Sequence, residues 1–415
     1  MNRHRNSESS SLQNSEPIFS GQHGQRDKNE QTVSTTSTFL PHLPEAEVRV
    51  KFRGCLLGGA VGDALGAPVE FMKRAEIVRQ FGARGIQDMV PAYGVLGAIT
   101  DDTQMTLFTA EGLLRGYVRS QRRGICHPPS LIDAAYRRWL HTQEESPGGT
   151  GKTDRGWLFQ QTELFAQRAP GMTCIAALKA KRILGTPADN DSKGCGGVMR
   201  VAPVGMMLKA LSAEHSALRD ANFRQAFDLA CQAAALTHGH PTGQLTAGAF
   251  AAIIFLLLEG QSLRDSIEQA LVLLREQHHH EETTAAINRA VDLAERSTPP
   301  EQALDWLGEG WIAEEALAVG IFCALTAKDF ESGVVMAVNH NGDSDSTGLI
   351  AGHLLGALHG IDAVPERWLK NLELRGVLEI VADDLATVAK WTLDDDQSAA
   401  GFAESDFYTA RYPGS

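Results

Sequence analysis

Helical periodicity of apolar residues runs through this chain from about Val48 to Lys390 with no convincing break. Within 49–66, 223–238 and 243–260, apolar residues recur every three or four positions, which is the spacing that buries one face of a helix. Alternating β-branched runs bounded by hairpin turns are scarce. The sequence therefore predicts an all-α fold with one compact helical domain.

The two ends of the chain have a different composition from this middle part. Residues 1–46 are rich in Ser, Asn, Gln and Thr and show no periodicity, so they bury too little apolar surface to offset the entropy of ordering. They form either a flexible tail or an arm that orders on a partner, with Ile18, Phe19, Phe39, Leu40 and Leu43 as anchors. We therefore place the domain at 47–390 and a loosely attached C-terminal tail at 391–415.

Charge and cysteine usage exclude several classes of protein. The formal net charge of −13 argues against nucleic-acid binding, because a duplex repels an acidic surface. The six cysteines are far apart and include no C-x-x-C pair, which favours reduced thiols in a cytoplasmic protein. The most apolar run, 247–258, is too short to span a bilayer and predicts a buried core helix, so we expect no membrane partner.

Two acidic segments stand where helices are expected to begin. Thr100, Asp101 and Asp102 form the first; alone, an N-cap threonine followed by acids is more often a structural device than a site. Asp343, Asp345 and Ser346 form the second, ahead of a helix expected at 349–359. Hard oxygen ligands of this kind favour Mg²⁺ or Mn²⁺ over Zn²⁺, and the absence of a glutamate at position twelve excludes an EF-hand.

If both helix starts converge, the four buried carboxylates repel one another strongly unless cations neutralise them. We therefore predict a binuclear centre that holds two Mg²⁺ or Mn²⁺ ions. A third segment, Ser192 to Arg200, is rich in glycine and could aim backbone N–H groups at a phosphate. It lacks the Gly-Lys-Ser/Thr ending of a Walker loop, and alone it could equally be a turn.

Six segments in this order resemble the ADP-ribosylglycohydrolase family, which includes dinitrogenase reductase-activating glycohydrolase. The matching segments are GCLLGGAVGDALGAPVEF, GAITDDTQMTLFTAEGLL, LFAQRAPGMTCIAAL, SKGCGGVMRVAPVG, LTHGHPTGQLTAGAF and NHNGDSDSTGLIAGHLLGALHG. They extend from about Phe52 to Leu374, so the resemblance covers most of the chain.

The resemblance implies an all-α fold, two Mg²⁺ or Mn²⁺ ions and a role for each matched residue. The implied metal ligands are Thr100, Asp101, Asp102, Asp343, Asp345 and Ser346. The implied catalytic residues are Glu70, Asp101, Asp102 and Asp345. Asp63 is implied to support the residues of the site without binding the metals itself. The implied ADP-ribose contacts are Ser192, Gly194, Cys195, Gly196, Gly197 and His238, with Asp154 on the substrate side.

Two positions depart from the family pattern. Cys195 stands where some relatives carry Asn, so its contact with the ligand could come from the backbone only. Ser346 replaces a frequent Thr but keeps the hydroxyl, and no carboxylate is lost. We therefore expect an active enzyme rather than a metal-free scaffold.

Three further polar sites keep two interpretations each. His278, His279 and His280 look like a metal site, although an exposed junction between helices fits their polar neighbours better. His340 either supports the metal site or caps a helix. Asp154 either receives a guanidinium or is a solvated loop charge.

The function implied is hydrolysis of the N-glycosidic bond that joins ADP-ribose to a protein side chain, and arginine is the side chain expected. The expected partner is therefore an ADP-ribosylated protein. An immunity role against an ADP-ribosyltransferase toxin is compatible with this activity. The alternative is a binding protein that neutralises such a toxin through residues 1–46, with or without hydrolysis.

Overall fold

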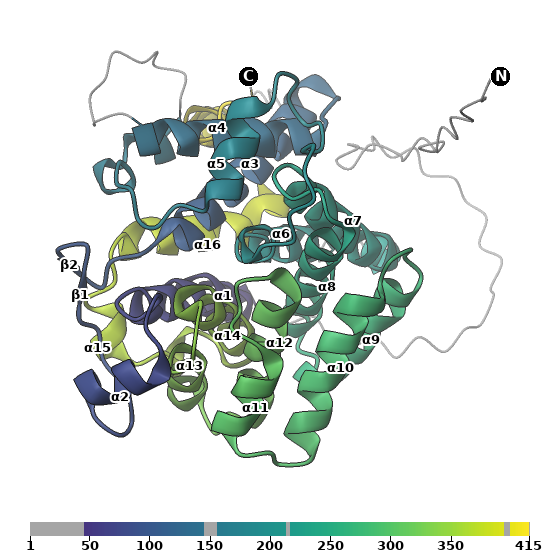
Figure 1. Cartoon of the computed structure of the whole chain (residues 1–415). Helices are drawn as coiled ribbons and strands as arrows, with labels where there is room; N and C mark the ends of the chain where they lie inside the picture. Colours follow the sequence, from purple (N-terminus) through teal and green to yellow (C-terminus); the bar gives the residue numbers. More distant parts are fainter. Residues whose placement is uncertain (1–44, 145–155, 213–215, 394–398, 415) are drawn as a thin grey trace, which may run out of the picture.

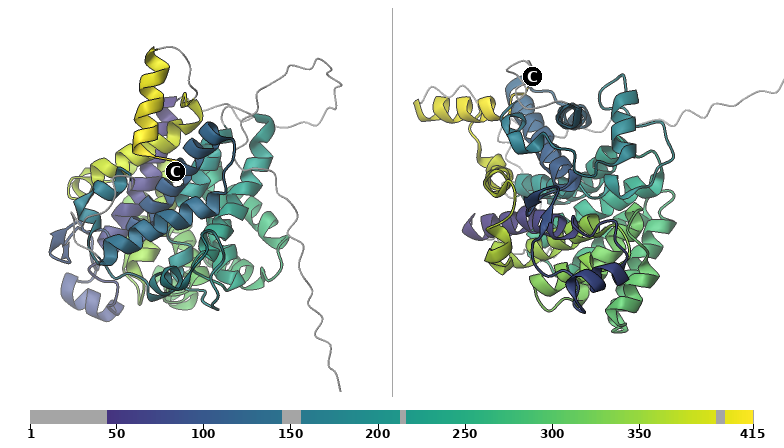
Figure 2. Two further views of the ribbon diagram at one scale, coloured as in Figure 1. Left: turned by 90° about the horizontal axis from the view of Figure 1, so that it is seen from above. Right: turned by 60° about the vertical axis from the view of Figure 1, so that its left-hand side comes forward.

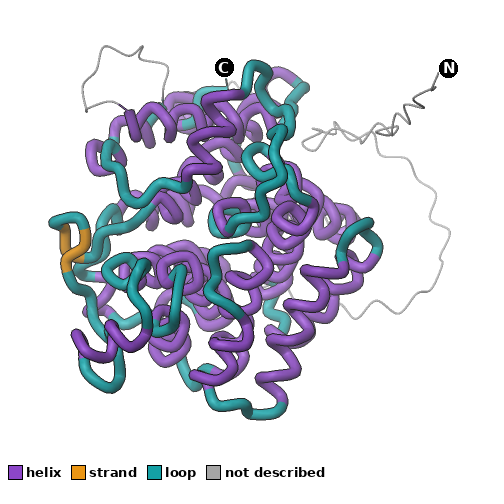
Figure 3. The backbone as a smooth tube through the Cα atoms, viewed as in Figure 1, coloured by secondary structure: helices purple, strands orange, loops and turns teal. Residues whose placement is uncertain are grey.

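The computed structural model describes residues 45–144, 156–212, 216–393 and 399–414, and their regular structure is almost entirely helical (Figure 1). Its one sheet among these residues is a short antiparallel hairpin of β1 (Pro91–Ala92) and β2 (Val95–Leu96) (Figure 3). The helices are α1 (Glu45–Gly66), α2 (Arg74–Phe81), α3 (Asp101–Arg123), α4 (Pro128–Glu144), α5 (Met172–Ala180), α6 (Ala202–Ser212), α7 (Arg219–Ala235), α8 (Pro241–Leu258), α9 (Leu263–Arg275), α10 (Glu281–Glu295), α11 (Pro300–Leu307), α12 (Ala313–Thr326), α13 (Phe330–Val338), α14 (Ser344–His359), α15 (Glu366–Leu369), α16 (Arg375–Thr387) and α17 (Ala399–Arg411). The predicted all-α fold is confirmed.

Helix α14 packs along its length against the second half of α1, from Gly54 to Gly66, through glycines spaced four residues apart. A Cβ atom added at any of these α1 glycines would collide with the backbone of α14. At Gly58, for example, it would lie 2.6 Å from the carbonyl oxygen of Gly352. Glycines four apart lie on one helix face, so the two backbones touch directly. The facing positions are Gly54, Gly58, Gly62 and Gly66 on α1 and Gly356, Gly352, Gly348 and Ser344 on α14.

Helix α8 forms the centre of the part that is coloured teal and green in Figure 1, where it packs against α6, α7, α9 and α12. It is the one helix of the described residues that is long and apolar enough to cross a membrane. Since 89% of that stretch is buried inside the protein, it has the surroundings of a core helix, as predicted from the sequence.

The other helices surround the α1–α14 pair. Helices α3 and α4 pack together in the upper part of Figure 1, whereas α12 and α13 contact α14 in the lower part. The two further views in Figure 2 show the same close assembly, with α17 projecting at one edge. The N-terminus of α3, the N-terminus of α14 and the C-terminus of α1 meet between these groups.

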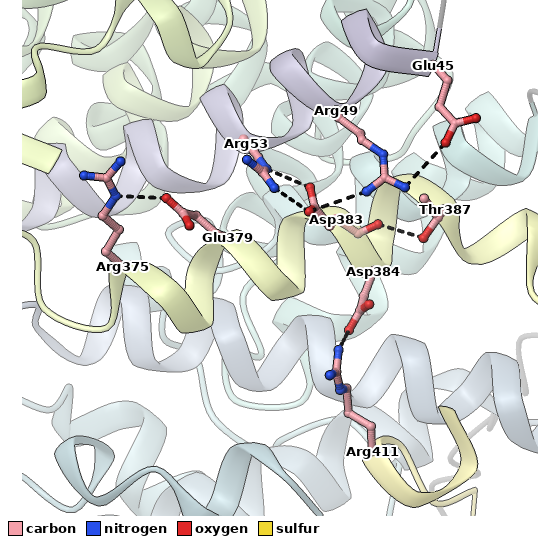
Figure 4. A network of polar contacts seen from close by, with 9 residues as sticks. All are labelled: Glu45, Arg49, Arg53, Arg375, Glu379, Asp383, Asp384, Thr387 and Arg411. Atoms are coloured by element: carbon pink, nitrogen blue, oxygen red, sulfur yellow. Dashed lines mark hydrogen bonds and ion pairs between the residues drawn. The ribbon is translucent and has the colours of Figure 1, made fainter. Parts of the chain in front are cut away.

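The end of the chain is attached by specific contacts, which corrects the prediction of a loosely attached tail. The ring of Trp391 stacks on that of Tyr408 at 3.7 Å between centroids, and Tyr412 is 1% exposed. Asp384 of α16 accepts hydrogen bonds from Arg411 at 2.9 Å and from the Tyr412 hydroxyl at 2.6 Å. On the other side of α16, Asp383 pairs with Arg53 of α1, so α16 joins α1 to α17 (Figure 4).

One expected helix boundary was wrong. The helix predicted to begin at Leu349 begins at Ser344, because the acidic segment itself forms its first turn. Further along the chain, α15 and α16 are separated by a break, where Leu374 adopts a left-handed conformation with φ 57°. The break directs Glu373 at Arg168, with which it forms a buried ion pair of 3.1 Å.

We predict that Gly58→Ala destabilises the protein, although alanine favours a helix more than glycine does. The added methyl group must push two backbones apart, and such overpacking costs about 1–3 kcal/mol. Gly376→Ala in α16 is the matched control, because nothing lies within 4 Å of its added Cβ. Thermal unfolding should show a lower melting temperature for Gly58→Ala and an unchanged or higher one for Gly376→Ala; equal melting temperatures would contradict the packing described.

Candidate metal centre

Asp63, near the end of α1, holds the start of α3 in place. Its carboxylate accepts hydrogen bonds from the backbone N–H of Thr100 at 3.0 Å and of Thr103 at 3.1 Å, and from the Thr103 hydroxyl at 2.5 Å. The Thr100 hydroxyl in turn caps α3 by accepting from the N–H of Asp102 at 3.2 Å. The free N–H groups of a helix start favour carboxylates, so Asp101 and Asp102 lie at a position that stabilises their charge.

The second acidic segment lies beside the first. The Ser346 hydroxyl donates a hydrogen bond of 2.7 Å to the Asp102 carboxylate, across 244 positions of sequence. Asp345 accepts from the N–H of Ser346 at 2.9 Å, and the N–H of Asp343 donates to the carbonyl of Glu309 at 2.8 Å. The two acidic helix starts identified in the sequence therefore converge at one place.

Glu70 reaches the same place from the turn that follows α1. One carboxylate oxygen from each of Glu70, Asp343 and Asp345 lies within 4.8 Å of the others. Glu70 is 6% exposed, and its Oε2 has no hydrogen-bond partner among the described residues. A buried carboxylate oxygen without a partner is costly, so this oxygen points to a ligand.

The acids at this place have raised pKa values. Burial, and then the charges of Asp345 and Asp343, raise the pKa of Glu70 to about 11. Burial and then Asp345 raise the pKa of Asp63 to about 7. Burial is also the first cause of the raised pKa values of Asp101, Asp102, Asp343 and Asp345.

These observations fit the divalent cations that the resemblance implies. Four aspartates and Glu70 offer hard oxygen ligands, and each of them is at least 94% buried. Burial and neighbouring carboxylates, rather than basic side chains, govern their pKa values. Cations would relieve this repulsion, and Thr100 and Ser346 each keep a lone pair for coordination.

The glycine-rich segment lies next to the acids, where it includes a short 3₁₀ turn, η4 (Cys195–Gly197). The N–H of Cys195 donates to the carbonyl of Trp311 at 3.1 Å, and its carbonyl accepts from Val198. The N–H of Cys195 is therefore already paired within the protein, and the expected backbone contact of this residue with a ligand stays a prediction. The Cys195 thiol instead faces Asp343 and Asp102, which, after burial, raise its pKa.

The other predicted substrate residues surround this turn. The Ser192 hydroxyl lies 3.3 Å from that of Thr173. The Nε2 atom of His238 would be 3.4 Å from a Cβ added at Gly194 or at Gly196, so the imidazole packs on the glycines. A side chain at Gly196 would also meet the Cys174 sulfur at 2.9 Å, which explains why this position has none. Burial and then Arg200 lower the pKa of His238 to about 3, so the ring is neutral.

Arg200, which was not predicted as a site residue, is completely buried behind this turn. It donates to the Thr237 hydroxyl at 2.6 Å, lies over the ring of Tyr136 at 4.3 Å and reaches the Cys174 sulfur at 3.3 Å. Within the described residues it has no carboxylate partner. A lone basic residue in the apolar stretch VMRVAPVG was the signal that could have identified it.

The remaining predicted positions lie elsewhere or have structural partners. His278, His279 and His280 form the partly exposed junction between α9 and α10, as the second interpretation expected. His340 lies 2.8 Å from the Thr347 hydroxyl and is buried close to Asp343. Asp154 and residues 1–44 lie outside the described residues.

Comparison with known proteins identifies the class to which this fold and this cluster of acids belong. The family model described as ADP-ribosylglycohydrolase matches residues 44–394. The chain is 26% identical to ADP-ribosyl-(dinitrogen reductase) glycohydrolase of Rhodospirillum rubrum, over 79% of this chain and 92% of that protein. It is 23% identical to ADP-ribosylarginine hydrolase Tri1 of Serratia proteamaculans, over 84% of this chain and 82% of that protein.

A solved structure agrees with these relatives. The chain matches a protein titled "ADP-ribosylglycohydrolase-related protein complex" with a TM-score of 0.58 and 26% identity, over 83% of this chain and 99% of that chain. The protein is thus a hydrolase of ADP-ribose linkages. It belongs to the ADP-ribosylglycohydrolase family, which confirms the resemblance found in the sequence.

We predict that Mg²⁺ stabilises the protein more strongly as the pH rises from 5.5 to 8. Carboxylates whose pKa is raised on folding stabilise the metal-free fold fully only below about pH 4, and this stability is lost as the pH rises through their folded pKa values. Protons also compete with cations for the same oxygens, at about 1.4 kcal/mol per pH unit for each displaced proton. The measurement is the difference in melting temperature between Mg²⁺ and EDTA at each pH.

Taking this difference at each pH cancels titrations that cations do not affect, such as those of the buried histidines. In Asp345→Asn, the difference in melting temperature between Mg²⁺ and EDTA should depend less on pH, because one competing carboxylate is removed. A difference that does not change with pH, or that is the same in Asp345→Asn, would contradict a cation site at these acids.

Proposed function

We propose that this protein removes ADP-ribose from arginine side chains with the help of two divalent cations, Mg²⁺ or Mn²⁺. The observation that carries the proposal is the hydrogen bond from Ser346 to Asp102, which joins the two acidic helix starts into one buried cluster. The arginine linkage is supported by the name of the relative Tri1, an ADP-ribosylarginine hydrolase. The predicted cytoplasmic location agrees with the six free cysteines of the described residues.

The reaction breaks the bond between the anomeric ribose carbon and the guanidinium nitrogen. Water supplies the hydroxyl group that joins the ribose carbon, and the leaving nitrogen gains the other proton of that water. Asp101, Asp102, Asp343 and Asp345, with Thr100 and Ser346, would hold the cations. When bound, the cations supply Lewis acidity and neutralise these carboxylates.

Glu70 is suited to the proton transfer in this reaction. Its Oε2 is buried and has no partner in the part of the chain that the structure describes, and its raised pKa gives it a high affinity for a proton. The raised pKa is caused by burial and by Asp345 and Asp343, so cations at these acids would lower it toward the working pH. Glu70 would therefore take a proton from the attacking water and return it to the leaving nitrogen.

The ADP-ribose part of the substrate would lie along the glycine segment. Neutral His238 offers its Nε2 beside Gly194 and Gly196, and the Ser192 hydroxyl lies at the start of the same segment. Arg200, buried behind the turn, adds a positive potential that favours the diphosphate group.

The test is the release of ADP-ribose from an ADP-ribosylated arginine peptide, with Mg²⁺ and with EDTA. We expect release that depends on Mg²⁺, and a loss of about a hundredfold or more in Asp345→Asn, because a ligand matters at least as much as its supporting groups. Asp362→Asn, an exposed acid in the 3₁₀ turn after α14, is the matched control and should keep full activity. No release from arginine or from any other linkage would end the proposal.

A role in immunity, with a toxin as partner, is the second candidate function. It is favoured by residues 1–43, which precede the part of the chain matched by the family model. In one version, this segment blocks an ADP-ribosyltransferase while the domain removes the modification.

Deleting residues 1–43 separates the two roles. If the segment binds a toxin, the truncated protein should keep its hydrolase activity but lose its affinity for an ADP-ribosyltransferase, measured by calorimetry. Unchanged affinity would show that the segment is only a tail.

A further inference from the structure

Two aromatic side chains stack on each other next to the acids without being buried. The ring centroids of Phe71 and Trp311 are 5.8 Å apart and their planes are inclined by 17°. Phe71 is 71% exposed and Trp311 is 38% exposed. Large aromatic rings that remain in water beside a catalytic site indicate a binding surface, because burial in the core would otherwise be favourable.

Both rings are attached to parts of the site. Phe71 directly follows Glu70 in the turn after α1. The backbone of Trp311 is fixed to the glycine segment, since its carbonyl accepts from the N–H of Cys195 at 3.1 Å. The stack therefore spans the distance from the proposed proton-transfer residue to the proposed ADP-ribose segment.

A carboxylate accompanies the stack. The indole N–H of Trp311 donates to Glu309 at 3.2 Å, and the carbonyl of Glu309 accepts from the N–H of Asp343 at 2.8 Å. The hydrogen bond from the Lys73 ammonium is the main cause that lowers the pKa of Glu309 below its usual value. The Glu309 carboxylate is therefore ionised. Glu309 is thus tied through its backbone to one of the proposed metal ligands.

We infer that Phe71, Trp311 and Glu309 form a subsite for the guanidinium of the modified arginine, an inference that rests on the proposed function. A guanidinium is flat, stacks on aromatic faces and pairs with carboxylates, and the stack and Glu309 offer both contacts together. A serine-linked substrate has no flat cation at this point. The subsite therefore selects arginine linkages.

In the structure, Lys73 forms an ion pair with Glu309. The ammonium lies 2.5 Å from the carboxylate, and the two side chains are 58% and 45% exposed. Exposed pairs of this kind contribute little stability, so a substrate guanidinium displaces the lysine at small cost.

The first experiment measures binding without catalysis. Agmatine carries a guanidinium, and putrescine is the matching diamine without it; both are titrated into the full-length protein with Mg²⁺, and dissociation constants are obtained by ligand-detected NMR. We expect agmatine to bind more tightly than putrescine, and Trp311→Ala or Glu309→Gln to weaken agmatine about tenfold. Trp306→Ala, which removes another exposed tryptophan in α11, is the matched control and should have no effect. Equal binding of agmatine by wild type and Trp311→Ala, or no binding by wild type, overturns the inference.

The second experiment compares the release of ADP-ribose from arginine-linked and serine-linked peptides. Trp311→Ala should raise KM for the arginine-linked peptide and leave its melting temperature and its affinity for free ADP-ribose unchanged. An unchanged preference between the two linkages overturns the inference. If wild type releases nothing from either peptide, the proposed function fails, and agmatine binding still decides whether the subsite exists.

Discussion

The direct contact between the backbones of α1 and α14 determines where the proposed metal centre lies. Four positions on α1 face four positions on α14, and any side chain larger than hydrogen at the facing glycines would push the helices apart. The contact extends to Gly66 and Ser344, the end of one helix and the start of the other. Asp343, Asp345 and Ser346 are therefore fixed beside the turn that carries Glu70. Helix α3 is then fixed to the same point by Asp63, which lies in the last turn of α1 and binds N–H groups at the start of α3.

This arrangement concentrates negative charge in the interior, and the surrounding helices make that tolerable. Buried carboxylates destabilise a fold unless cations or hydrogen bonds compensate. Asp63 is compensated by two N–H groups and a hydroxyl, and Asp101 accepts from the N–H of Gly171 at 3.1 Å. Glu70 has one oxygen for which the described segments provide no such partner. The part of the cluster with the least compensation within the protein is thus the part at which a ligand is expected to bind.

Much of this site could be predicted from the sequence because helix starts have a local signature. Thr100 followed by two acids identifies a capped helix start, and the structure has it there. The packing of α1 against α14 has no local signature. Glycines four residues apart are present in the sequences of both helices, but nothing in either sequence indicates that residue 58 contacts residue 352. The break at Leu374 and the packing of Tyr412 depend on contacts with Arg168 and Asp384, which lie far away in sequence. For the same reason, the hydrogen bond that occupies the N–H of Cys195 could not be anticipated.

The two sides of the glycine turn differ in charge, and this difference matches the substrate proposed. On one side lie the carboxylates of Asp343 and Asp102, which suit cations and ribose hydroxyls. On the other side lies Arg200, buried without a carboxylate partner among the described residues, next to a neutral His238. A buried cation costs free energy unless an anion approaches it, so the turn favours an anionic group on that side. ADP-ribose joins a diphosphate to a ribose, so one ligand carries both the anionic group that suits the buried cation and the hydroxyls that suit the acids. The missing side chains of the turn are what allow both potentials to reach the same ligand.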